Sequence, residues 1–175
     1  MQMSSDQHKA NATIIRTVLV AYNERTHMST IYEPLSDEGQ VELYLFNAIF
    51  GWFYLSVTSK IPLQEENLKK YVAVAGGQFQ GAQAEYYRAS FTSLFFDRFT
   101  NYKKELQLVK TSQLTGNEYL PAYFFIRLYK YPLGKEPIGE YETVRRFSGE
   151  SNSIMILLFK NHVNHLRTLL DIEIV

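Results

Sequence analysis

The feature that most constrains the fold is a long apolar run without a single charge. It begins at Leu43 and ends at Ser59, between the charged residues Glu42 and Lys60. Its length is at the lower limit of the ~17 to 25 residues that a membrane-spanning helix needs. The run also holds small or polar residues, namely Asn47, Gly51, Ser56, Thr58 and Ser59. We therefore interpret residues 43–59 as a buried core helix, with contact to a membrane as the alternative.

Apolar residues recur at helical spacing through most of the remaining chain. The pattern predicts a helix that has Pro62 in its first turn and ends near Gly76, and further helices at about residues 11–28, 82–109, 118–131, 140–147 and 154–170. The longest of them, residues 82–109, is expected to be the central helix. The segment 118–131 is dense in aromatic residues, so a β-strand is its alternative.

Composition is typical of one globular domain. The chain has 175 residues, of which 46% are hydrophobic and 21% charged, and it shows no internal repeat or long linker. It contains 13 Tyr and 12 Phe, which predicts a core rich in aromatic side chains. We predict an all-α fold, a single-domain helical bundle of about six or seven helices over residues 11–175, preceded by a flexible N-terminus, residues 1–10.

Charge and cysteine content exclude several classes of function. Eighteen basic and eighteen acidic residues cancel, so no global field attracts nucleic acid or an anionic membrane. Cysteine is absent, which excludes disulfides, Cys-ligated zinc, iron–sulfur clusters and thiol nucleophiles. Residues 1–10 are polar and lack the apolar segment of a secretory signal, so a cytoplasmic location is expected.

Two histidines stand three residues apart on the predicted C-terminal helix. His162 and His165 could bind one metal ion from a shared face, but no Asp or Glu lies one turn from either of them. His8 and His27 cannot be placed beside them from the sequence. We interpret the pair as ordinary histidines at the edge of an apolar stripe, and we predict no metal and no other cofactor.

The most coherent candidate binding surface interleaves aromatic and cationic side chains. Its members are Tyr119, Tyr123, Arg127, Tyr129, Lys130, Tyr131 and Lys135. Tyr and Arg dominate the hot spots of protein interfaces, and the same combination holds single-stranded nucleic acid through stacking and phosphate contacts. On one helix these residues do not all share a face, so some of them must belong to the core.

No stretch of the chain forms a specific catalytic motif. The glycines at 76, 77 and 81, for example, lack the Lys and the Ser or Thr of a phosphate-binding loop. We therefore expect a non-enzymatic helical protein that interacts with a protein partner or with itself, such as a small bacterial or phage regulator or inhibitor. One alternative is an aromatic-lined pocket for a small apolar or planar ligand, with or without catalysis. Single-stranded nucleic acid binding is third, because the net charge is zero.

Overall fold

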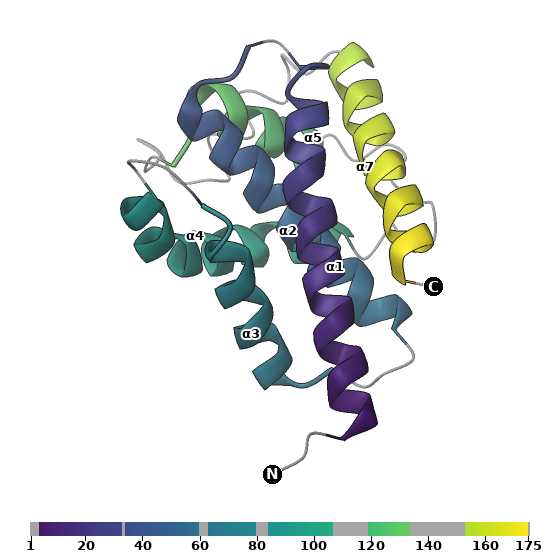
Figure 1. Ribbon diagram of the computed structural model, residues 1–175. Coiled ribbons are helices and arrows are strands. Elements are labelled where there is room, and N and C mark those ends of the chain that lie inside the picture. The colour runs from purple at the N-terminus through teal and green to yellow at the C-terminus, as the bar shows by residue number, and fades with distance from the viewer. Residues whose placement is uncertain are drawn as a thin grey trace.

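Helix α2 (Asp37–Thr58) runs through the middle of the molecule (Figure 1). The computed structural model describes residues 4–32, 34–59, 63–79, 84–106, 119–133 and 153–174. Ser36 caps α2, because its hydroxyl accepts a hydrogen bond from the Gly39 amide at 3.1 Å. Every residue from 41 to 55 is buried, as predicted for the apolar run. The helix is long and apolar enough to cross a membrane, and 83% of its most apolar window is buried inside the molecule.

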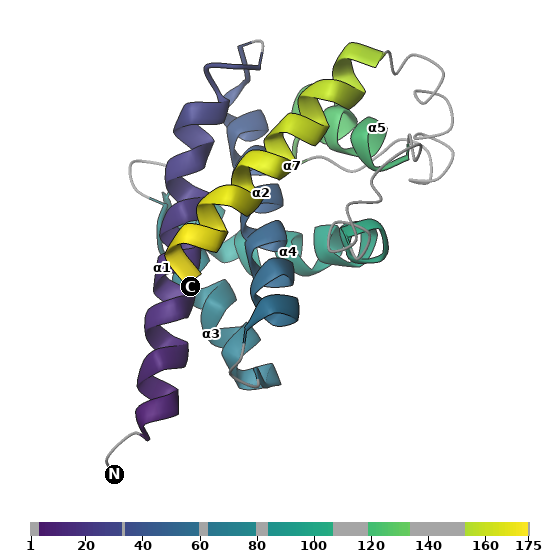
Figure 2. The same cartoon turned by 90° about the vertical axis from the view of Figure 1, so that its right-hand side faces the viewer.

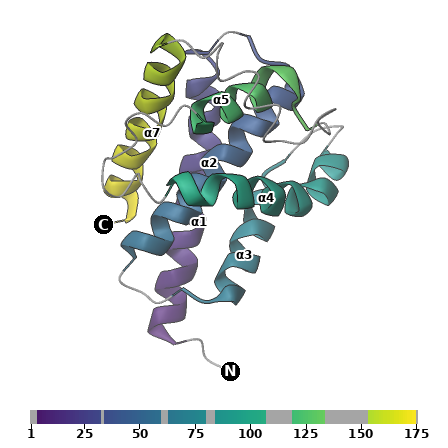
Figure 3. The same ribbon diagram turned by 180° about the vertical axis from the view of Figure 1, so that it is seen from behind.

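The other helices pack around α2 and give an all-α domain with an aromatic core, as predicted. In the described part of the chain they are α1 (Ser5–Met28), α3 (Glu65–Gly76), α4 (Ala84–Leu106), α5 (Tyr119–Phe125), the π-helical turn η2 (Ile126–Lys130) and α7 (Ser153–Ile174). Because α2 contacts α1, α3, α4, η2 and α7, it is the central helix, and the expectation that residues 82–109 would be central is wrong. Figure 3 shows α4 crossing α2 on the side opposite α1.

Helix α7 runs in the opposite direction to α1 and lies against both α1 and α2. Figure 2 shows it crossing in front of α2, with its C-terminal end beside α1. Its inner face holds Phe159, Val163, Leu166 and Leu170, all buried. This packing brings side chains of α1 beside side chains from the far end of the chain.

One helix boundary differs from the predicted one, and one predicted helix has an unexpected geometry at its end. Helix α1 begins at Ser5 and not near residue 11, because Ser4 and Gln7 form a capping box with bonds of 3.1 and 3.3 Å. The aromatic segment is helical and not a strand, and it ends in π geometry, since the Tyr131 amide donates to the Ile126 carbonyl at 2.9 Å. The helix predicted at residues 140–147 lies outside the described residues.

The core is aromatic, and its tyrosines find acceptors on neighbouring helices. The Tyr44 hydroxyl donates to the Ala75 carbonyl and the Tyr71 hydroxyl donates to the Ala48 carbonyl, each at 2.7 Å. A buried hydroxyl without a partner would be costly, so these bonds allow large side chains with a polar end to fill the interior. Gly51 of α2 lies under Tyr71, where a Cβ atom would be only 2.9 Å from the hydroxyl oxygen.

A buried ion pair joins α2, α4 and the turn that follows η2. The Arg98 guanidinium donates to Glu42 Oε1 at 2.6 Å, and the two side chains are 3% and 1% exposed. The Leu133 amide donates to the same oxygen at 3.0 Å. Asp97 also contacts Arg98, but its side chain is 55% exposed. The pair therefore fixes three segments of the fold relative to one another.

Candidate metal centre

The sequence-predicted binding surface is divided by the structure between the core and the exterior. Tyr123 and Arg127 are buried, and the Arg127 guanidinium lies 5.3 Å from the centre of the Tyr123 ring. Arg127 Nε also donates to the Tyr123 hydroxyl at 3.3 Å. In contrast, Tyr129 is 38% exposed and Lys130 is exposed, while Tyr131 is half-buried. These residues therefore do not form one continuous surface.

The structure describes neither of the side chains of the two remaining members of that set. Tyr119 begins α5, and its side chain lies outside the described part of the structure. Lys135 lies outside the described residues as a whole. The exposed part of the predicted surface is therefore described only around Tyr129 and Lys130.

The two histidines of α7 lie in different environments. His162 is fully buried, with Tyr32 and Asn47 at hydrogen-bonding distance from its two ring nitrogens. Burial lowers the pKa of His162 to about 3, with a smaller contribution from the charge of His165, so its imidazole is neutral near pH 7. His165 lies at the surface with 42% of its side chain exposed. The two rings therefore do not form a shared metal site.

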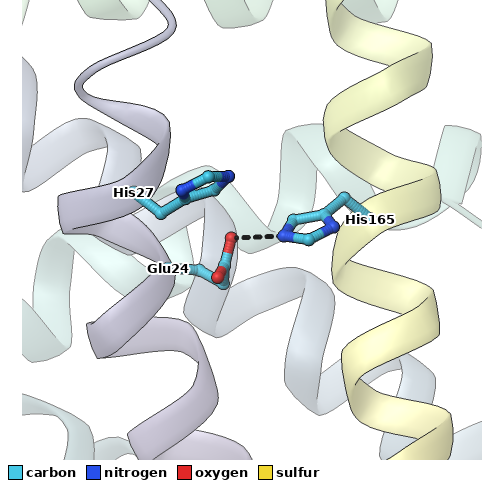
Figure 4. Close-up of side chains that lie close together, drawn as sticks. All are labelled: Glu24, His27 and His165. Atoms are coloured by element: carbon cyan, nitrogen blue, oxygen red, sulfur yellow. Dashed lines mark ion pairs between the residues drawn. The ribbon is translucent and has the colours of Figure 1, made fainter.

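His165 instead meets two side chains of α1, as Figure 4 shows. Glu24 and His27 are three residues apart on α1, so they share one face of that helix, and this face is turned toward α7. The ring centres of His27 and His165 are 5.2 Å apart, and Glu24 Oε2 is 3.1 Å from His165 Nε2. We refer to Glu24, His27 and His165 as the His–Glu cluster.

The carboxylate of the cluster has an oxygen that lacks a hydrogen-bond donor. Glu24 Oε2 is buried and, among the described residues, accepts no hydrogen bond. His165 Nε2 is near enough at 3.1 Å, but the contact does not have the angle of a hydrogen bond. The contact with His165 Nε2 is an ion pair only when that imidazole is protonated, so a cation held between the three side chains is a second way to balance the buried carboxylate oxygen.

The spacing of the cluster fits a transition-metal ion after small movements. One potential ligand atom from each residue lies within 4.8 Å of the others. Zinc ligands at ~2.0 to 2.2 Å from the ion would be roughly 3.3 Å apart in a tetrahedral site, so the Glu24 to His165 distance already fits. His27 is exposed and His165 partly so, and both rings have room to close the remaining distance. Imidazole and carboxylate ligands together favour Zn²⁺, Cu²⁺, Ni²⁺ or Fe²⁺ over Mg²⁺ and Ca²⁺.

Part of this site has a signal in the sequence that the sequence interpretation missed. Glu24 and His27 have the Glu-x-x-His spacing with which helical bundles bind metal ions. The third residue, His165, has no such signal, because only the packing of α7 on α1 brings it there. No Asp or Glu lies one turn from His165 on α7, because the acid beside it is Glu24 of α1.

No protein-family model matches this chain, and comparisons with curated proteins and with solved structures also found no match. Function is therefore inferred from the geometry of the site itself.

Proposed function

We propose that this protein is a metal-binding helical domain that holds one divalent transition-metal ion with Glu24, His27 and His165. The observation that carries the proposal is the buried Glu24 Oε2, which accepts no hydrogen bond from the described residues and lies 3.1 Å from His165 Nε2 within the His–Glu cluster. Two imidazole side chains and one carboxylate supply ligand atoms of the kind that such ions prefer. Zn²⁺ is the first ion to test because it accepts this ligand set without a geometric preference of its own.

The expected consequence of binding is a link between α1 and α7. Glu24 and His27 belong to α1, whereas His165 belongs to α7, so one ion bound by all three would hold the two helices together. A ligand that binds the folded chain and not the unfolded chain raises stability, by ~2.7 kcal/mol at a hundredfold excess over its Kd. Three protein ligands leave at least one coordination position for water or for a further ligand.

The proposal is tested by titrating chelator-treated, untagged protein with Zn²⁺ in a calorimeter and by measuring thermal unfolding with and without the ion. Glu24→Gln, His27→Gln and His165→Gln should each weaken binding at least about tenfold, because each removes one ligand. His8→Gln is the matched control, since His8 is exposed on α1 and lies outside the cluster. Equal affinity in His8→Gln and His165→Gln would refute the site.

A second proposed function is protein–protein interaction through the exposed part of the aromatic segment. Tyr129 is 38% exposed, and its ring stacks on that of Phe125 with 6.2 Å between the ring centres. This stacking already restrains the Tyr129 side chain, so its immobilisation in an interface would cost little conformational entropy. Lys130, next to it in the sequence, is also exposed and adds a positive charge.

The test of this second function is an affinity capture in which bound proteins are identified by mass spectrometry. A true partner should be lost with one substitution and kept with its control. Tyr129→Ala should abolish its capture, and a melting temperature that stays well above the temperature of the assay shows that the variant is folded. Tyr86→Ala is the control, because Tyr86 is a 65% exposed tyrosine on α4. Equal capture by the two variants would reject this surface. The small-ligand pocket and the binding of single-stranded nucleic acid stay predictions.

A further inference from the structure

A chain of buried hydrogen bonds lies next to the His–Glu cluster. His162 Nε2 is 2.9 Å from Asn47 Oδ1, and His162 Nδ1 is 2.8 Å from the Tyr32 hydroxyl. Asn47 Nδ2 in turn donates to the Ala21 carbonyl at 3.2 Å. We refer to Tyr32, His162 and Asn47 with the Ala21 carbonyl as the His162 network. It links the turn that follows α1 to α7 and α2, and through the Ala21 carbonyl to the C-terminal third of α1.

The direction of these bonds is set by the chemistry of the groups. The amide oxygen of Asn47 can only accept, so His162 Nε2 carries the proton and donates it. The ring is neutral, because burial lowers the pKa of His162 to about 3, and Nδ1 therefore accepts from the Tyr32 hydroxyl. Both ring nitrogens are thus satisfied by one arrangement of the three side chains.

The network lies one turn from the metal ligands on both helices. His162 precedes His165 by three residues on α7, and Ala21 precedes Glu24 by three residues on α1. A shift of α7 along α1 by one turn would move His165 ~5.4 Å away from Glu24 and would also break the buried bonds of His162.

The rings around His162 do not select that register by themselves. His162 also contacts Phe46 and Phe124, with ring centres 5.4 and 5.6 Å apart. Contacts between apolar rings tolerate sliding and repacking, whereas hydrogen bonds at fixed distance and angle do not. Buried polar groups that are fully satisfied specify one arrangement of a core for the same reason.

We propose that Tyr32, His162 and Asn47 are positioning residues of the metal centre, and that they set the register of α7 on α1 which places His165 beside Glu24. The metal-centre part of this inference rests on the proposed function, whereas the register part does not. His162 does not itself bind the ion, because both of its nitrogens are already engaged.

The first test compares the zinc affinity of folded variants well below their melting temperatures. His162→Leu removes both hydrogen bonds and should weaken binding at least about tenfold, because loss of the register moves His165 away from Glu24. His162→Gln retains one donor and one acceptor and should restore most of the affinity. Val163→Ala, a buried neighbour on α7, is the control for general destabilisation and should bind as the wild type does.

The second test measures the register without a metal ion. The chain has no cysteine, so Asn23→Cys on α1 and Asn164→Cys on α7, both at exposed positions, allow a pair of spin labels. The wild type and His162→Gln should give one narrow distance distribution. His162→Leu should give a shift of up to ~5.4 Å or a clear broadening. If His162→Leu does not fold, Asn47→Leu replaces it, since it removes the acceptor of Nε2.

The outcomes separate the inference from the proposed function. Failure of the wild type to bind zinc would reject the metal centre, while the spin-label distances would still decide the role of the network in the register. Wild-type distances and wild-type zinc affinity in folded His162→Leu would overturn the inference. An equal loss of affinity in Val163→Ala would also overturn it, because general destabilisation would then account for the effect.

Discussion

The buried ion pair between Glu42 and Arg98 predicts a large loss of stability for the substitution Glu42→Gln. Gln keeps the shape of the side chain and one acceptor oxygen, but it removes the negative charge opposite a guanidinium that is 3% exposed. Asp97, 55% exposed, is then the remaining carboxylate in contact with Arg98 among the described residues. Removing one partner of a buried ion pair costs ~3 to 5 kcal/mol. We expect a loss of ~3 kcal/mol, at the lower end of this range, because Gln keeps one oxygen that can accept a hydrogen bond from Arg98.

Urea unfolding followed by circular dichroism measures this loss, and Glu65→Gln is the matched control. Glu65 forms an exposed pair with Lys69 at 2.9 Å on the surface of α3, so its neutralisation should leave the unfolding midpoint almost unchanged. The double variant Glu42→Leu with Arg98→Met should recover much of the loss, because apolar side chains then replace both charges. Equal midpoints for Glu42→Gln and Glu65→Gln would refute the reasoning.

Gly51→Val should lower the stability by ~1 to 3 kcal/mol in thermal unfolding, because even a Cβ atom at this position meets the Tyr71 hydroxyl. Gly77→Ala is the control and should leave the stability unchanged, because a Cβ atom there has no neighbour nearer than 3.4 Å. Tyr71→Phe should cost ~1 kcal/mol in urea unfolding, since it removes the bond to the Ala48 carbonyl, and an unchanged midpoint would contradict this. In chelator-treated protein, stability should fall as the pH decreases from 6.5 toward 3, because the unfolded chain then binds a proton at His162 that the folded chain does not. The slope should reach ~1.4 kcal/mol per pH unit from this group, and His162→Gln should remove that part.

The helical architecture could be predicted because it follows from local periodicity. The uncharged run forms most of α2 and is buried from residue 43 to 55, because burial removes its many apolar side chains from water. The centre of the bundle was predicted wrongly because length was taken as the criterion. Residues on all sides of α2 are buried, whereas α4 keeps one exposed face, and that difference decides which helix is central. The early start of α1 had its signal in Ser4 and Gln7.

The candidate site could be predicted only in part, because its residues come from distant parts of the chain. The i,i+3 spacing of Glu24 and His27 is visible in the sequence, but the partner on α7 depends on how two helices pack. The burial of Arg127 could not be predicted either, because a cationic residue is usually expected at the surface. Arg127 can be buried because the Tyr123 hydroxyl accepts a hydrogen bond from its Nε. For Tyr and Arg, which have both apolar and polar parts, the sequence pattern does not predict whether the side chain is buried or exposed.

The contact between α1 and α7 also determines when the His–Glu cluster forms during synthesis of the chain. Tyr32 and His162, beside the cluster, are 130 residues apart in the sequence. A ribosome adds residues in order, so α1, α2 and α3 can assemble before α7 exists. Contacts between such distant residues also form slowly, because a long segment must first be closed. A nascent chain that ends before α7 therefore contains only Glu24 and His27 of the cluster, and the proposed metal centre can be completed only after α7 has been made and has packed on α1.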